Sequence, residues 1–198
     1  MRPRFETSTK HTAIPYVPVK REHRENHGYI DLKRNPERVD DVPEIQSEPE
    51  LREFIKELNH ARSLFRSAGC DTNHGPHDDP IYKYGMSSFV TLVYEIVDWN
   101  CNARNFRELY DEFCKFLSHA PEPLPEPVEI VFELQFVTFG EHEGKKAHGL
   151  TIDVRAWGRD AANARHIWAD ALRIVRSFFE ETRERFGVNL DRGAVTVS

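Results

Sequence analysis

The residues with the clearest chemical potential lie in one stretch near the middle of the chain. Within ten positions this stretch supplies a thiol, two imidazoles and a carboxylate, from Cys70, His74, His77 and Asp79. These are the ligand types of zinc and related divalent metals, although the Cys-x3-His-x2-His spacing matches no standard zinc finger. The same stretch is rich in Asn, Gly, Pro and Asp, as exposed turns are. A divalent metal site and a solvated loop therefore both remain open interpretations.

Other catalytic signatures are absent from the sequence. It contains no Gly-x-Ser-x-Gly nucleophile elbow, no GxxxxGK[ST] phosphate loop and no GxGxxG after a predicted strand. The three cysteines, Cys70, Cys101 and Cys114, are odd in number and have no CxxC spacing, which predicts a reducing compartment. The first ten residues show no apolar signal core, and the longest apolar stretch, 89–97, is too short to span a bilayer. We therefore expect a cytoplasmic protein with no membrane partner.

Length and composition favour one globular domain preceded by a tail. The 198 residues are 39% hydrophobic and include thirteen Phe, which is enough for one core over residues 47–198. Residues 1–46 contain five prolines and only scattered apolar side chains, so we expect a disordered or extended arm. The alternative is an arm laid across its own body or a second subunit, with Ile14, Tyr16 and Val17 in its adhesive part. Through Arg38 nine Lys and Arg face five Asp and Glu, so a basic arm precedes an acidic body.

The first predicted helix covers residues 47–68. Ser47 and Glu50 have the spacing of a capping box, and apolar residues then recur every three or four positions as far as Ala68. Gly69 supplies a stop signal. Residues 69–87 are rich in turn formers and are predicted to form a loop.

From residue 88 to the C-terminus, the pattern reads strand, helix, strand, strand, helix, strand. The elements are a strand at 89–99, a helix at 103–119, strands at 128–136 and 150–156, a helix at 161–185 and a short strand at 193–197. The proline-rich stretch 121–127 is a stiff connector between the first helix and the second strand. This βαββαβ order predicts an α+β fold with a ferredoxin-like, split βαβ antiparallel sheet, an extra N-terminal helix and an extended N-terminal arm.

The strand predicted at 89–99 is apolar on both of its faces. Val90, Leu92 and Tyr94 alternate with Phe89 and Val93, as in a central strand that is covered on each side. The two predicted helices of the βαββαβ unit can cover one face of the sheet. Either the helix at 47–68 or a second copy of the chain must then cover the other face.

These observations favour a non-enzymatic binding or assembly module that is homodimeric and needs no cofactor. Its candidate binding residues are the apolar and aromatic side chains Ile14, Tyr16, Val17, Trp99 and Trp157. The alternative is a metal-dependent, hydrolase-like enzyme that holds zinc or another divalent metal at Cys70, His74, His77 and Asp79. Nucleic-acid binding is disfavoured, because the acidic body would repel phosphates and the strand at 150–157 lacks the aromatic pattern of RNA-recognition domains.

Overall fold

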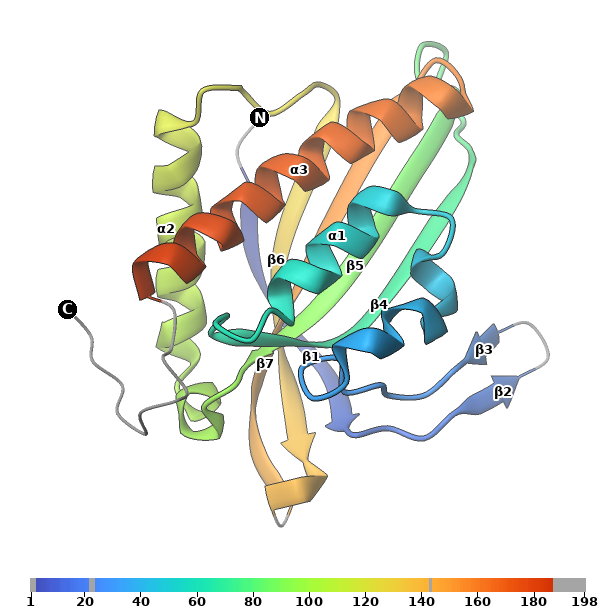
Figure 1. Ribbon diagram of the computed structural model, residues 1–198. Helices are drawn as coiled ribbons and strands as arrows, with labels where there is room; N and C mark the ends of the chain where they lie inside the picture. Colours follow the sequence, from blue (N-terminus) through green and yellow to red (C-terminus); the bar gives the residue numbers. More distant parts are fainter. Residues whose placement is uncertain (1–2, 22–23, 143, 187–198) are drawn as a thin grey trace.

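A computed structural model describes residues 3–21, 24–142 and 144–186 of the chain (Figure 1). The strands are β1 (Arg4–Ile14), β2 (Val19–Arg21), β3 (Arg24–Asn26), β4 (Phe65–Pro76), β5 (Tyr84–Tyr94), β6 (Val128–Phe139) and β7 (Lys145–Gly158). The helices are α1 (Pro49–Leu58), α2 (Ala103–His119) and α3 (Ala161–Phe186), and short 3-10 turns cover Pro36–Asp41, Pro43–Ile45, Val97–Cys101 and Gly140–His142. The strand predicted at 193–197 lies outside the described residues.

Five strands form one mixed sheet in the order β1-β6-β7-β5-β4, and β2 pairs with β3 in a separate hairpin. β7 runs antiparallel to both β6 and β5, so β5 and β6 are parallel to each other on either side of it. α2 lies between β5 and β6 in the chain. The edges of the sheet differ from the prediction. β4 flanks β5, and β1 pairs with β6 in parallel, so the fold is mixed α+β and a ferredoxin-like sheet is not confirmed.

The first helix is shorter than predicted, because α1 ends at Leu58. Asn59 ends it: the Asn59 side-chain amide donates to the Ile55 carbonyl and the Ser67 hydroxyl, each at 2.8 Å, and its oxygen accepts from the Ser67 backbone N–H at 3.2 Å. These bonds hold the chain in a turn that leads directly into β4. The apolar residues 65 and 68, which continue the helical period, therefore belong to a strand. Ser47 does not cap the helix, whose N-cap residue is Glu48.

The predicted loop at 69–87 is wrong, because most of it forms the β4–β5 hairpin. The two strands pair from Phe65 opposite Tyr94 to Pro76 opposite Tyr84. Turn chemistry is confined to the tip, where the Asp79 carboxylate accepts backbone N–H bonds from Ile81 and Tyr82 at 2.8 Å. The outer half of β4 contains no buried residue on either face, so it tolerates polar residues and its composition resembles that of a loop.

The strand predicted at 89–99 is displaced, since β5 covers 84–94 and a 3-10 turn follows at Val97–Cys101. The buried side chain of Asn100 causes this turn. Its oxygen accepts from the Tyr94 backbone N–H at 2.8 Å, and its amide donates to the Tyr94 carbonyl at 2.9 Å. One asparagine thus closes the end of β5 and redirects the chain toward α2.

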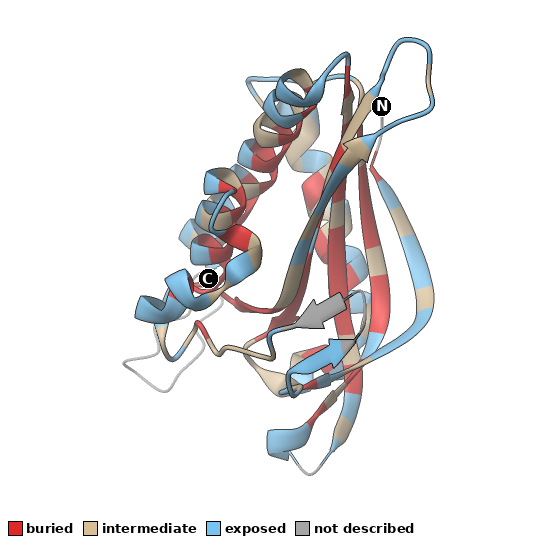
Figure 2. Cartoon of the chain, turned by 90° about the vertical axis from the view of Figure 1, so that its right-hand side faces the viewer, coloured by how far each residue is buried: buried red, intermediate tan, exposed pale blue. Residues whose placement is uncertain are grey.

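All three helices cover one face of the sheet, and the main core lies between these two layers (Figures 1 and 2). α2 and α3 occupy their predicted positions, and β6 and β7 form the predicted antiparallel pair. Aromatic rings fill the centre of this core, including Phe113, which packs on Phe132 and Phe178 with ring centroids 5.0 and 5.2 Å apart. α1 packs beside α3 on this same face, so the helix predicted at 47–68 does not cover the opposite one.

The opposite face, which we call the second face, carries a smaller core at one end. This cluster takes side chains from all five strands, namely Ile14, Ala68, Val93, Val137, Phe139 and Ala147. Because both edge strands contribute to one cluster, the sheet is curled at this end. Tyr29, from outside the sheet, packs against the same cluster.

The N-terminal segment covers part of the second face. Its first part is an ordered edge strand, β1, and the described residues of 15–46, here called the strap, follow the body of the protein. Tyr29 of the strap lies on the second face, whereas Leu32, Val39 and Ile45 join the main core. The strap therefore passes around the outer edge of β4. The described residues of 15–46 thus lie against the body of the protein.

Candidate functional site

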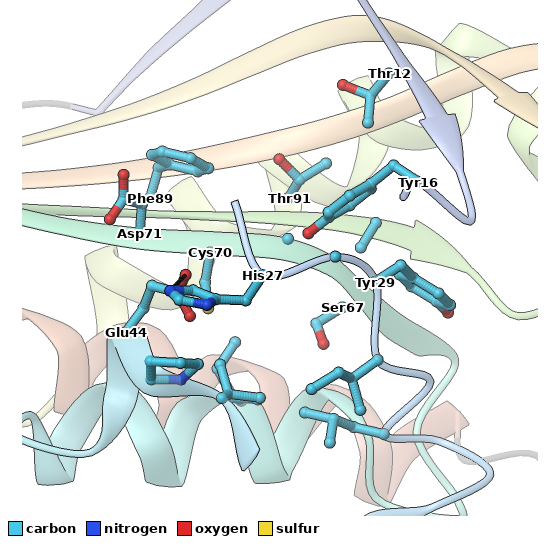
Figure 3. A pocket seen from close by; sticks show the side chains of 18 of the residues that line it. Thr12, Tyr16, His27, Tyr29, Glu44, Ser67, Cys70, Asp71, Phe89 and Thr91 are labelled. Carbon is cyan, nitrogen blue, oxygen red and sulfur yellow. Dashed lines mark ion pairs between the residues drawn. The ribbon is translucent and has the colours of Figure 1, made fainter. Parts of the chain in front are cut away.

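A pocket of about 530 Å³ lies between the strap and the β4 edge of the sheet, and we call it the strap pocket (Figure 3). It extends from the second face around this edge to Ile55 of α1. This volume falls within the range of small-molecule sites. The strap contributes Tyr16, His27, Tyr29 and Glu44 to its lining, and the sheet contributes Gly69, Cys70 and Asp71 of β4 with Phe89 and Thr91 of β5. Residues 11–13 of β1 complete the wall, so both edge strands of the curled sheet border the pocket.

Tyr16 is held in the pocket by its backbone and by a glycine. Its carbonyl accepts a hydrogen bond from the Tyr29 backbone N–H at 3.0 Å, and the two phenol rings meet edge to face with centroids 6.1 Å apart. A Cβ atom at Gly69 would lie 3.3 Å from the Tyr16 hydroxyl oxygen. Gly69 therefore gives the phenol room to lie against the backbone of β4.

Thr91 supplies a buried and neutral polar group to the pocket. Its hydroxyl lies 2.8 Å from the Thr151 hydroxyl of β7 and accepts a bond from the Gln135 amide of β6 at 3.4 Å. All three side chains are buried. This network across three strands fixes the hydroxyl at the pocket wall without adding charge.

The ionisable groups of the pocket combine neutral acids with two carboxylates. Burial, followed by the nearby charges of Glu44 and Asp71, raises the pKa of the Cys70 thiol to about 12. Burial, followed by Cys70 and Glu44, likewise raises the pKa of Tyr16 to about 12. Both groups are protonated at neutral pH, so neither the thiol nor the phenol is an activated nucleophile. Glu44 lies 3.9 Å from the imidazole of His27 across the pocket entrance.

None of the comparisons with protein-family models, curated proteins and solved structures found a match. The function of the strap pocket must therefore be argued from its own residues. Within the described part of the chain, no helix combines the length and apolar character needed to cross a membrane.

Lys33 fastens the strap beside the pocket. Its ammonium donates to three backbone carbonyls that follow α1, those of His60 and Ser63 at 2.7 Å and that of Phe65 at 3.1 Å. Burial lowers the pKa of Lys33 to about 8, although Glu95, Asp31 and Glu57 act against this shift. One partly desolvated charge thus ties the strap to the turn between α1 and β4.

Arg66 forms a second polar contact with the strap, and its geometry is loose. Its guanidinium is buried and lies 3.7 Å from Asp31 and 3.9 Å from Glu95, beyond hydrogen-bond distance. It also stands over the Phe139 ring, 5.8 Å from the centroid. Among the described side chains, Arg66 Nε, Asp31 Oδ2, Glu95 Oε2 and the Tyr29 hydroxyl are buried without a hydrogen-bond partner. Unsatisfied groups of this kind make the strap contact weaker than apolar packing of the same area.

The structure does not bring the four predicted metal ligands to one point. Cys70 and His74 stand four residues apart on β4, roughly 13 Å along an extended strand. His74 Nδ1 lies 2.9 Å from the Tyr84 hydroxyl, His77 Nδ1 lies 3.2 Å from the Tyr82 carbonyl, and Asp79 caps the hairpin turn. In residues 3–21, 24–142 and 144–186, no group of three or more His, Cys, Asp and Glu is placed to hold a metal ion.

The five predicted binding residues are spread over the molecule. Ile14 is buried in the second-face cluster and Tyr16 lines the strap pocket, so these two lie in one region. Val17 is 74% exposed. Trp99 packs edge to face on Tyr94 beside the main core, and Trp157 lies near His77 of the β4–β5 hairpin. Whether these residues bind a partner stays a prediction.

Several pocket residues were missed by reasoning from sequence alone. Glu44 and Tyr29 belong to the arm, and Phe89 was interpreted only as one face of a covered strand. Gly69 offered a usable signal, because a glycine within a strand often marks a close approach of another group. That signal was hidden by the helical period before it, which made Gly69 resemble a helix stop.

Proposed function

We propose that this protein is a non-catalytic binding module that holds a small organic molecule in the strap pocket. The observation that carries the proposal is that the two faces of the sheet are covered in different ways. The helices pack on one face over an apolar core, whereas the strap leaves a pocket of about 530 Å³ where it passes from the other face around the β4 edge. Aromatic rings with a few polar groups are the usual lining of ligand sites, and the protonated thiol and phenol support binding over covalent catalysis.

A fragment screen on the full chain tests this proposal. Amide spectra recorded by NMR with a chemically diverse fragment panel should show hits that shift the resonances of Tyr16, Gly69 and Thr91. Gly69→Val should abolish these shifts, because the new side chain enters the space beside the Tyr16 hydroxyl. Gly75→Val is the matched control on the same strand, where a Cβ meets nothing within 4 Å, and it should leave binding intact. A panel without hits at the pocket, or hits that survive Gly69→Val in a folded protein, contradicts the proposal.

Homodimeric assembly through the strap is a second proposal, and exposed apolar residues of the strap support it. Val17 and Val19 are 74% and 40% exposed, and both lie in the prolyl segment that follows β1. Replacing both by Ser should shift the mass measured by light scattering from dimer to monomer. A wild-type chain that stays monomeric at high concentration contradicts this proposal.

The free thiols of Cys70, Cys101 and Cys114 support a proposed cytoplasmic location.

A further inference from the structure

The charged residues of the strap pocket indicate which class of ligand it binds. Its lining includes two carboxylates, Glu44 and Asp71, and no Lys or Arg among the residues that the structure describes there. Four cations lie next to lining residues in the sequence, namely Lys10, Lys33, Lys56 and Arg66, and all are engaged elsewhere. Lys10 pairs with Glu133, and Lys56 pairs with Glu53. Lys33 donates to three backbone carbonyls, and Arg66 faces Asp31, Glu95 and the Phe139 ring. The pocket therefore carries a net negative formal charge when its histidines are neutral.

The two carboxylates act on the same part of the pocket. Both contribute to the raised pKa of the Cys70 thiol, and Glu44 contributes to that of Tyr16 as well. In the close view, Asp71 and Phe89 extend from one side of the β4–β5 ladder, and Cys70 and Glu44 lie on the other side, at the same end of the pocket (Figure 3). Asp71 is paired with Phe89 across the β4–β5 ladder. Negative charge is thus concentrated beside Cys70 at one end of the pocket.

Aromatic surface accompanies these charges. Phe89 is 39% exposed although it lies on a central strand, and the Tyr16 ring is on the other side of Thr91 in the same view (Figure 3). The faces of aromatic rings attract cations, and the attraction is stronger where water is excluded. An anionic ligand would meet two carboxylates without a compensating cation from the described lining. A cationic ligand gains from both the carboxylates and the rings.

We infer that the strap pocket binds a small organic cation, an ammonium group on an aromatic or apolar body. The ammonium lies beside Glu44 and Asp71, and the body packs on Phe89 and Tyr16. This inference rests on the proposed small-molecule binding and adds the chemical class of the ligand. Glu44 has a further role, since an ammonium must compete with His27 for this carboxylate at the pocket entrance.

Three probes that share a phenyl ring and a short chain test the inference: phenethylamine, 2-phenylethanol and 3-phenylpropanoate. Titrations of the full chain are followed by the amide resonances of Gly69 and Thr91, up to about 10 mM because simple probes bind weakly. We expect the amine to bind about tenfold more tightly than the alcohol, the gain of one charge-assisted contact. The carboxylate should bind least.

Charge variants distinguish this inference from the proposed function. Glu44→Gln keeps the side-chain shape and should weaken amine binding by about fivefold to tenfold, with no effect on the alcohol. Asp71→Asn is the second variant. Glu37→Gln, an exposed carboxylate of the same strap away from the pocket lining, is the control and should change neither affinity. If all three probes bind equally, or the Gln and Asn variants bind the amine unchanged, the cation inference fails and the binding module stands. If no probe and no fragment reaches the pocket, both fail.

Discussion

The two faces of the central sheet are covered in different ways. The helix face is covered by α1, α2 and α3 over a continuous core of buried apolar and aromatic side chains. The second face has a six-residue apolar cluster at one end, and the strap, which Lys33 and Arg66 fasten to the body, covers only part of the remainder. Apolar burial provides most of the folding free energy, whereas loosely paired polar groups contribute little or cost free energy. The stable layer thus supports the fold, and the weaker layer provides the pocket.

Two phenylalanines on β6 offer the strongest test of this contrast. Phe132 points into the main core and Phe139 into the second-face cluster, and both are fully buried. Phe132→Ala should lower the free energy of unfolding by about 3–5 kcal/mol. Phe139→Ala should cost less, because its smaller cluster can relax, and should increase hydrogen exchange first in residues 14–35. Chemical denaturation and exchange mass spectrometry measure the two effects. If both variants lose the same free energy of unfolding and hydrogen exchange rises uniformly, the two faces are equally stable and the contrast is wrong.

Removing Lys33 should loosen the strap with less effect on the helix face. Lys33→Met breaks three hydrogen bonds from an ammonium and leaves three carbonyls to be satisfied by water, at a cost of about 2 kcal/mol. Exchange should rise near residues 29–35 and 60–65. Lys56→Met removes an exposed i,i+3 pair with Glu53 and should cost less than about 0.5 kcal/mol. A Lys33 variant no less stable than the Lys56 variant would contradict the fastening role.

Two tyrosines allow the helix face and the strap to be compared through single hydroxyl groups. On the helix face, the Tyr94 hydroxyl donates to the Asn105 carbonyl at 3.0 Å, so Tyr94→Phe should cost about 1 kcal/mol. The Tyr29 hydroxyl of the strap is buried without a partner among the described residues, so Tyr29→Phe should be neutral or stabilising. Both values come from urea denaturation of the full chain. If Tyr29→Phe lowers the free energy of unfolding more than Tyr94→Phe does, the Tyr29 hydroxyl forms a hydrogen bond in solution and the expectation is wrong.

The smallest expected effect is a dependence of the strap on pH. The pKa of Lys33 is lowered to about 8 in the folded protein, so between pH 8 and its ordinary value the unfolded chain binds more protons. The stability of the wild type relative to Lys33→Met should therefore rise as pH increases from 7 to 9. The raised pKa of Cys70 lowers the stability of both proteins above pH 9, and it cancels in the difference between them. A flat difference between the two proteins below pH 9 would contradict a desolvated Lys33.

The elements that the sequence predicted well are those whose signals are local. α2, α3 and the β6–β7 pair follow from side-chain periodicity with caps or turns nearby, and the structure confirms them. Errors arose where a single asparagine side chain bonded to a residue six or eight positions away. Asn59 ended α1 by bonding to Ser67, and Asn100 ended β5 by bonding to Tyr94. No periodicity records such contacts, because they depend on which backbone groups meet after folding.

The sequence by itself determined that the fold mixes helices and strands, that α2, α3 and the β6–β7 pair form, and that the N-terminal segment differs from the rest in composition. The tertiary structure alone decided where that segment lies, that β4 and β5 form a hairpin, and that Tyr16, Glu44 and Gly69 border one pocket. Hydrophobic periodicity specifies which face of an element is buried, but it does not specify against what. The second face has a mixed polar surface, so strand pairing and a few buried charges determine which segment lies on it.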